Sequence, residues 1–524
     1  MSAAALPRET EQQVGRRTRL LTPTGATAVR GLTLSASATA GLYFALFLLL
    51  RGRSFRLTQT LTLVRWDSLR AISDALTPQS LVTTTWRMDR AALHEYLYGA
   101  LALGLIALWL YSLWQSRPGR AVLGLPVILL AAGVFSLPLI FLPGMFSGDI
   151  YLYMFYGRIV SRYAENPLLV RPDVFQGDPH LLWVYWKWLP SAYGPVWLMF
   201  SGALSGIAGN ALFANIFTYK VGALGLHLLT IAVVWSVLKR VRPELAAWGA
   251  IFYGWNPLVL LETVGSGHND VMVALFVALS MGAAMYKRWP LAVFFLVGAA
   301  MVKLTALILL PALLLAWVLS QPDLRTRLRA ASLGCAVSVL SIGVLYAPLW
   351  AGTAIVTNAR LNPASERYLN TPWEYLLIRF GGAQYTEPEN RISLFLDVAR
   401  NALFAALFIY VTYRMLRGRT MSDTWLWLWF AYCVTLGWIW PWYFLLVIPV
   451  VAMQGPGRAA ALGVGLTIGG MLFWMGWPDP PLPAAPWTYN YRAFTLLAPA
   501  VIIAAWPALS RRVERMIGAE ASSG

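Results

Sequence analysis

Long apolar runs recur along almost the whole chain, and they limit the fold more than any other feature of the sequence. A helix needs about 20 consecutive apolar residues to cross the ~30 Å hydrocarbon core of a bilayer. The runs lie at 32–50, 93–114, 121–142, 195–211, 214–237, 245–263, 269–286, 290–302, 304–320, 330–349, 394–415, 424–440, 441–454, 459–475 and 493–509. The alternating, strand-length segments of a membrane β-barrel are absent. We therefore predict an all-α polytopic membrane protein, a bundle of about 13 to 14 transmembrane helices.

The charges support this prediction. Only 12% of the residues are charged, against about 25% in soluble domains. The formal net charge of +18 would suit a nucleic-acid-binding protein. Most of the basic residues, however, lie in short loops beside apolar runs, as the positive-inside rule and anionic lipid headgroups favour. We expect membrane lipids and no nucleic acid among the partners.

The same loops predict a topology in the cell inner (plasma) membrane. The apolar run after the basic N-terminal segment is too long for a signal peptide, so that segment is expected to be a cytoplasmic tail. Short basic loops such as 239–242 mark the cytoplasmic side, whereas longer connections rich in Pro, Trp, Tyr and Asn face outside. The expected divisions are a disordered tail at 1–31, a catalytic transmembrane module at 32–349 with an outer loop at 143–194, a second outer loop at 350–393, C-terminal transmembrane helices at 394–509 and a cytoplasmic tail at 510–524.

Two segments do not fit a simple alternation of cytoplasmic and outer loops. Residues 51–92 are basic, yet counting spans places them outside, where amphipathic helices would lie on the membrane. Between 143–194 and 239–242 an odd number of crossings is required, but two apolar runs are present. Either one run is re-entrant, or the pair contains a short third helix around Lys220.

The first candidate site follows the apolar run that ends near residue 142. Asp149 follows Gly144 and Gly148, which interrupt helical structure, so its carboxylate is expected at the outer membrane face. Tyr153 and Tyr156 lie on the same helical face as Asp149, and Arg158 follows two residues after Tyr156. An aspartate is also a good helix N-cap, and that role is compatible with a functional one.

A second candidate site lies in the sequence Gly-Ser-Gly-His-Asn-Asp at 265–270. Glu262 stands near the outer end of the preceding run, and His268, Asn269 and Asp270 follow it. Ionisable groups at membrane depth are costly and are functional candidates for that reason. Gly, Asn and Asp also suit an ordinary turn, but a turn requires neither the His nor the Glu.

Lys303 and the loop 350–393 supply further candidates. Lys303 interrupts an apolar stretch, either as a cation that holds a phosphate or as a lysine that reaches the membrane surface. Arg367 and Tyr368 suit a phosphate and a sugar face, and they equally suit an ordered surface loop. The aromatic turn at 438–443 is either part of the site or an aromatic belt.

These motifs resemble the GT-C glycosyltransferases, multispanning enzymes that use polyprenyl-phosphate sugars as donors. The motifs are SGDIYLY at 147–153, YGR at 156–158, NP at 166–167, AYGPVW at 192–197, NP at 256–257, GHND at 267–270 and KL at 303–304. They are similar to those of bacterial mannosyltransferases that elongate α-1,6-linked mannans. The resemblance covers about 140–320, and two extra runs precede Asp149, where many members of the class have one.

The resemblance implies an inverting transfer of a sugar, expected to be mannose, from a polyprenyl-phosphate donor to a glycan or glycolipid acceptor on the extracytoplasmic face. Asp149 would be the general base. The residues expected to bind substrates are Tyr153, Arg158, Tyr193, Glu262, His268, Asn269, Asp270, Lys303, Arg367 and Tyr368. Neither a metal nor another cofactor is expected.

A transporter or flippase of a lipid-linked or anionic substrate is the main alternative, and a non-catalytic scaffold is a second. A transporter would show related halves with paired broken helices and ionisable groups at the midplane. The sequence has no such symmetry, and its ionisable groups are expected in outer loops. We therefore favour the enzyme.

Overall fold

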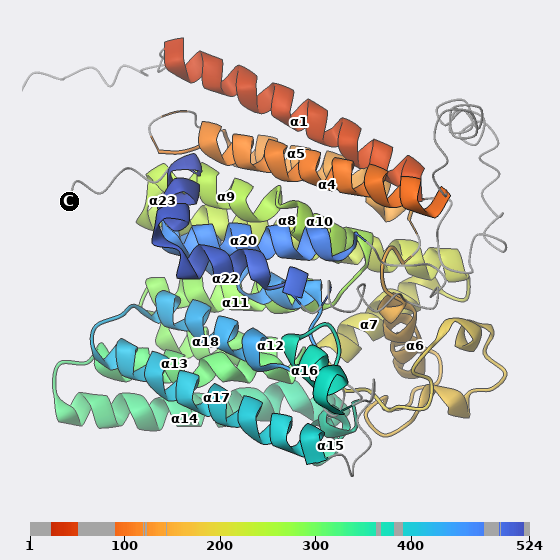
Figure 1. Ribbon diagram of the computed structural model, residues 1–524. Coiled ribbons are helices and arrows are strands. Elements are labelled where there is room, and N and C mark those ends of the chain that lie inside the picture. Colours follow the sequence, from red (N-terminus) through yellow and green to blue (C-terminus); the bar gives the residue numbers. More distant parts are fainter. Residues whose placement is uncertain are drawn as a thin grey trace, which may run out of the picture.

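The chain folds into a bundle of long helices in a computed structural model, shown in Figure 1. The structure describes residues 23–50, 90–118, 120, 123–142, 144–362, 368–381, 391–475, 492 and 494–517. Arg367, most of the basic segment (51–89) and parts of the two predicted tails (1–22 and 518–524) lie outside these ranges. Helix α1 begins at Pro23, so the predicted tail 1–31 ends in helix.

The described elements follow one another in chain order. They are α1 (Pro23–Leu50), α4 (Arg90–Gln115), α5 (Leu125–Ile140), α6 (Asp149–Ser161), η1 (Pro172–Val174), η2 (Pro179–Trp183), α7 (Pro195–Ala208), α8 (Leu212–Val241), η3 (Pro243–Leu245), α9 (Ala246–Gly254), α10 (Pro257–Leu260), the π-helix Leu261–Gly265, α11 (Asp270–Met285), α12 (Trp289–Ala300), η5 (Leu304–Leu309), α13 (Leu310–Leu319), α14 (Leu324–Tyr346), η6 (Ala347–Leu349), α15 (Ala354–Leu361), α16 (Pro372–Gly381), α17 (Arg391–Leu416), α18 (Met421–Thr435), η8 (Pro441–Leu446), α19 (Ile448–Gln454), α20 (Arg458–Phe473), α22 (Ala498–Ala505) and α23 (Pro507–Met516).

The prediction of an all-α membrane protein is confirmed. Five of the described helices are long and apolar enough to cross a membrane, and shorter apolar helices of 10–17 residues pack among them. Large apolar side chains cover the outer surfaces of these helices: Leu340 on α14 is 67% exposed and Ile409 on α17 is 68% exposed. Such exposure suits lipid contact. The total of about 13 to 14 crossings stays a prediction.

The lengths of α7 and α8 bear on the odd number of crossings expected between residues 195 and 241. Helix α7 has 14 residues, about 21 Å, which is too short to cross the hydrocarbon core. Helix α8 has 30 residues and runs unbroken through Lys220, so the predicted third helix there is wrong. In Figure 1, α6 and α7 lie at the right, the end where α15 and α16 also lie, while the α13–α14 connection lies at the left. One crossing by α8 therefore suffices.

The centre of the bundle is the segment from Leu245 to Leu275, in which every residue is buried. The run expected as one span at 245–263 is broken at Asn256-Pro257. There the Asn256 side chain caps α10 by accepting hydrogen bonds from the N–H groups of Leu258 and Val259. A π-helix, Leu261–Gly265, then widens the turn. π-Helical turns inside helices are frequent at functional sites, and this one carries Glu262.

Candidate functional site

Asp149 is the first residue of α6, in the position that the sequence predicted. Gly148 precedes the helix, and the Asp149 N–H donates to the Ser147 hydroxyl at 3.1 Å. The N-cap position of α6 is held by Gly148, not by Asp149, and no side chain caps the helix. The carboxylate is half-buried and lies at the end of the bundle to which α6 belongs. A cap is therefore not what this side chain provides.

Two tyrosines lie close to this carboxylate. Tyr153 and Tyr193 meet edge to face with ring centroids 5.1 Å apart, and the Tyr153 hydroxyl donates to Asn269 Oδ1 at 3.4 Å. Burial is the main reason that the pKa of Tyr193 is raised well above its usual value, and the carboxylates of Asp149 and Asp270 raise it further. Both acids therefore face the same pair of tyrosines.

Asp270 begins α11 and is paired with Lys303. The Lys303 ammonium lies 2.9 Å from Asp270 Oδ1 and 3.2 Å from Oδ2. The same ammonium lies over the ring of Tyr443, 4.5 Å from its centroid. Lys303 retains 17% side-chain exposure, against 4% for Asp270. The two candidates Asp270 and Lys303 thus form an ion pair between two separate segments, which the sequence did not predict, and Lys303 is the more exposed of the two.

Backbone pairing places Tyr193 next to Lys303. The N–H of Gly194 donates to the Val302 carbonyl at 3.0 Å, and the N–H of Val196 donates to the Met301 carbonyl at 3.1 Å. A Cβ on Gly194 would overlap the Met301 carbonyl, so a glycine is required for this approach. The motif at 192–197 therefore positions the residues before Lys303.

Glu262 and His268 form a second, fully buried pair. His268 Nδ1 lies 3.0 Å from Glu262 Oε2, and Trp474 Nε1 donates to Glu262 Oε1 at 2.7 Å. The His268 ring stacks on Trp442 with centroids 3.9 Å apart. Trp474 in turn stacks on Phe146 at 4.4 Å. Since Trp442 belongs to the predicted aromatic turn, that turn packs against the site.

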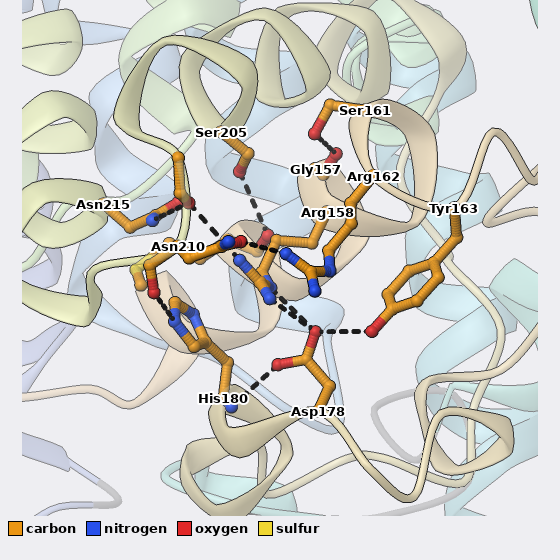
Figure 2. Close-up of polar contacts among 12 residues, drawn as sticks. Gly157, Arg158, Ser161, Arg162, Tyr163, Asp178, His180, Ser205, Asn210 and Asn215 are labelled. Atoms are coloured by element: carbon orange, nitrogen blue, oxygen red, sulfur yellow. Dashed lines mark hydrogen bonds and ion pairs between the residues drawn. The ribbon is translucent and has the colours of Figure 1, made fainter.

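Arg158 belongs to a different cluster, shown in Figure 2. Its guanidinium contacts Asp178 Oδ2 at 2.6 and 2.9 Å, and the Tyr163 hydroxyl donates to the same oxygen at 2.8 Å. Burial alone would raise the pKa of Asp178, but hydrogen bonds from Arg158, His180 and Tyr163 lower it below its usual value. The buried Arg158 is therefore paired with Asp178, and this pair holds the loop after α6 in place. Arg158 lies about 13 Å from Asp149 along the helix axis.

Tyr368 is also placed elsewhere. Its hydroxyl donates to Asp397 Oδ1 at 2.7 Å, and it packs with Leu377 and Leu396 between α16 and α17. Leu369, the next residue, exchanges backbone hydrogen bonds with 437–439, just before the aromatic turn. Tyr368 therefore borders the site through its neighbour, and Arg367 lies outside the described residues.

Comparison with known proteins supports the same region. Residues 63–319 match the model of the alpha-(1->6)-mannopyranosyltransferase family, N-terminal domain. The chain is 29% identical over 182 residues to alpha-(1->6)-mannopyranosyltransferase A of Corynebacterium glutamicum, covering 33% of this chain and 35% of that protein. This part of the chain is thus similar to alpha-(1->6)-mannopyranosyltransferases.

Other alpha-(1->6)-mannopyranosyltransferases show the same partial match. A probable alpha-(1->6)-mannopyranosyltransferase of Mycolicibacterium smegmatis is 24% identical over 243 residues, which is 41% of this chain and 42% of that protein. The A enzyme of Mycobacterium tuberculosis is 27% identical over 190 residues, 34% of this chain and 35% of that protein. The aligned segments thus span well under half of these relatives. The region matched by the family model includes Asp149, Asp270 and Lys303, and it ends before Tyr368.

Several residues of the site could not be predicted from the sequence around them. Trp474 lies 212 residues from Glu262, and nothing in its own segment indicates that its indole N–H reaches that carboxylate. Phe146 is similar, since its stacking on Trp474 depends on the packing of α20 against the loop before α6. Within the described residues, no three His, Cys, Asp or Glu side chains come together as a metal site.

Proposed function

We propose that this chain is a membrane mannosyltransferase that moves mannose from a polyprenyl-phosphate-linked donor to a hydroxyl of a lipid-linked or envelope glycan. The reaction would proceed with inversion on the extracytoplasmic face of the plasma membrane, with Asp149 as the general base. The family match and the relatives support the transfer of a mannose. The donor, the acceptor and the role of Asp149 are our inferences from the site.

The observation that carries this proposal is that Asp149, Glu262 and Asp270 differ in their partners. Asp270 is neutralised by Lys303, whereas Glu262 accepts a hydrogen bond from Trp474 and lies 3.0 Å from His268 Nδ1. Among the described residues, Asp149 has no ion pair, and it is half-buried rather than enclosed. A general base must be both accessible and free to accept a proton, and Asp149 meets both requirements best.

Lys303 is the cation best placed for the leaving phosphate. A phosphate needs charge-assisted donors, which stabilise the negative charge that develops as the glycosidic bond breaks. The ammonium is partly exposed, and its neighbour Tyr193 is held there by the Gly194–Val302 hydrogen bond. Arg158 is not part of this proposal, because Asp178 occupies its guanidinium.

Unpaired buried polar atoms beside these residues also support a bound polar ligand. His268 Nε2 and Asn269 Nδ2 have no hydrogen-bond partner within the described part of the chain. Buried polar atoms usually have one, and exceptions call for a reason such as a ligand. We propose that these two atoms, with Tyr153 and Tyr193, contact the sugar or the phosphate.

The chemistry balances with these groups alone. The acceptor hydroxyl gives its proton to the Asp149 carboxylate as its oxygen attacks the anomeric carbon of the donor. The bond from that carbon to the phosphate oxygen breaks, and its electron pair leaves with the polyprenyl phosphate. Attack opposite the leaving group inverts the anomeric centre. A positioned base contributes roughly 10²–10⁴-fold to such a step.

The test is transfer of radiolabelled mannose from polyprenyl-phosphate-mannose to membrane acceptors by the purified protein. We expect a labelled glycolipid or glycan product with the unaltered chain, and a loss of roughly 10²-fold or more with Asp149→Asn, because the amide cannot take the proton. Asp323→Asn is the matched control: Asp323 caps α14 from an exposed position, and asparagine caps equally well.

The outcomes separate the competing readings. Full transfer by Asp149→Asn would exclude Asp149 as the base. Movement of the lipid-linked sugar across the membrane without a new glycosidic bond would instead make the protein a transporter. If Asp323→Asn lost as much activity as Asp149→Asn, the loss would reflect folding rather than chemistry.

A further inference from the structure

Lys220 is a buried lysine that the proposed reaction does not use. It lies within α8, in its N-terminal third, with no solvent exposure. Its ammonium donates to two backbone carbonyls, that of Leu139 at 3.0 Å and that of Gly265 at 2.6 Å. Within the described ranges no carboxylate lies at ion-pair distance from it. A charge at this depth is costly, so its retention calls for an explanation.

The two carbonyls explain how the charge is tolerated. Leu139 is the penultimate residue of α5, and Gly265 is the last residue of the π-helix. Carbonyls in the last turn of a helix lack intrahelical partners and carry partial negative charge. Lys220 therefore joins the C-terminal ends of two helices, and these ends take the place of a carboxylate.

Both helix ends lead directly into the candidate site. Gly265 comes five residues before Asp270, and Leu139 comes ten residues before Asp149. The neighbouring residue Tyr219 extends the same connection, because its hydroxyl donates to the Tyr153 carbonyl of α6 at 3.2 Å. Two consecutive residues of α8 thus contact the elements that position both acids.

We propose that Lys220 is a positioning residue that sets the separation between the Asp149 segment and the His268–Asp270 segment. It does not touch the reacting atoms and acts through the carbonyls of Leu139 and Gly265. The expected effect of Lys220 on mannose transfer rests on the function proposed above. Its expected effect on the positions of the two segments does not depend on that function. A shift of about 1 Å between reacting groups can cost 10²-fold in rate.

His227 offers a matched comparison on the same helix. It lies seven residues after Lys220, about two turns along α8 and on the same face. It is fully buried, and its Nε2 contacts the Gly254 carbonyl at 3.1 Å, at the end of α9. Removing the His227 side chain also breaks a buried contact to a helix end. The residues after that helix end, however, do not lead directly to Asp149 or Asp270.

The experiment compares Lys220→Met with His227→Leu in lipid nanodiscs by amide hydrogen exchange. For Lys220→Met we expect exchange to become roughly tenfold faster or more in two peptides, 139–152 and 261–272, since each loses a charge-assisted hydrogen bond. For His227→Leu the increase should instead centre on 250–258. In the transfer assay, Lys220→Met should lower kcat by about 10²-fold, while the donor KM changes by less than about threefold.

Lys220→Gln provides a second variant that keeps donor groups without the charge. We expect an intermediate kcat from it, and it carries the test if Lys220→Met does not fold. Wild-type exchange in both peptides of a folded Lys220 variant would overturn the proposal, as would the same exchange pattern in His227→Leu. If the unaltered protein transfers no mannose but the two peptides respond as expected, the positioning role stands and the proposed function fails.

Discussion

Lys303 has a defined place between an acid and an aromatic ring, and this sets its expected behaviour at the residue scale. Its ammonium is paired with Asp270 and lies over Tyr443, yet part of it remains exposed. In Lys303→Ala we expect the KM for the polyprenyl-phosphate donor to rise roughly tenfold to hundredfold, the equivalent of one charged hydrogen bond. The KM for the acceptor should change little. Steady-state kinetics with each substrate varied in turn measures both.

A double variant separates phosphate binding from the loss of the ion pair. Lys303→Ala leaves the Asp270 carboxylate buried without its cation, which by itself destabilises a protein. In Lys303→Ala with Asp270→Asn that charge is absent, so stability should recover while the donor KM stays high. A donor KM restored by the second substitution, or a change confined to the acceptor KM, would contradict the assignment of Lys303 to the phosphate.

Single residues also show what the sequence could and could not predict. Asp149 could be placed at a helix start because glycines precede it, and the structure begins α6 there. Arg158 is on the same helix, but its partner Asp178 lies 20 residues later in an irregular loop, and no periodicity indicates that pairing. The same limit applies to Trp474 and Glu262. Helical spacing predicts on which face of a helix a residue lies. Its partner in a distant segment depends on how the helices pack, which the spacing does not show.

At the scale of elements, the approach of α6 to α7 depends on Gly157. A Cβ at this position would overlap the Tyr219 hydroxyl and the Ser201 carbonyl. We therefore expect Gly157→Ala to lower the free energy of unfolding by about 1–3 kcal/mol, as overpacking does. Mannose transfer should fall as well, because α6 begins with Asp149. Thermal unfolding in nanodiscs, together with the transfer assay, measures both effects.

Gly133→Ala is the matched control for this helix contact. Gly133 lies inside α5, and a Cβ there would meet no atom within 4 Å. Alanine favours helix over glycine, so this variant should match or exceed the stability of the unaltered protein, by up to about 1 kcal/mol. Equal thermal midpoints for Gly157→Ala and Gly133→Ala would show that the close contact of α6 with α7 contributes nothing.

The elements also show where hydropathy succeeds and where it fails. The runs predicted at 93–114, 214–237 and 394–415 correspond closely to α4, α8 and α17, because each is one uninterrupted helix. The run at 195–211 is equally apolar but forms the 14-residue α7, which packs on α6. The hydropathy of a segment shows that it prefers an apolar environment. Both the lipid bilayer and the protein core provide such an environment. Helix length and packing then distinguish a crossing from a helix buried at one end.

At the scale of the whole molecule, the two ends of the bundle differ in chemistry. The connections α13–α14 and α17–α18, at the left of Figure 1, are short; Arg417 and Arg419 lie in the second, and arginines 325, 327 and 329 follow the first at the start of α14. The opposite end carries α6 with Asp149 and the loop held by the Arg158–Asp178 pair. Basic loops remain in the cytoplasm during insertion. The acids are then expected at the outer surface, where the proposed lipid-linked donor would reach them.

Single-cysteine labelling tests this orientation. In a chain with Cys335→Ser and Cys433→Ala, we expect Gly177→Cys, in the loop after α6, to react with a membrane-impermeant maleimide in intact cells. Pro322→Cys, in the exposed α13–α14 connection, should react only after the membrane is permeabilised, because arginines follow it at the cytoplasmic side. Gly177 suits this purpose, since a Cβ there meets nothing within 4 Å. The reverse pattern of labelling would place the acids in the cytoplasm, where a donor presented at the outer face does not reach them.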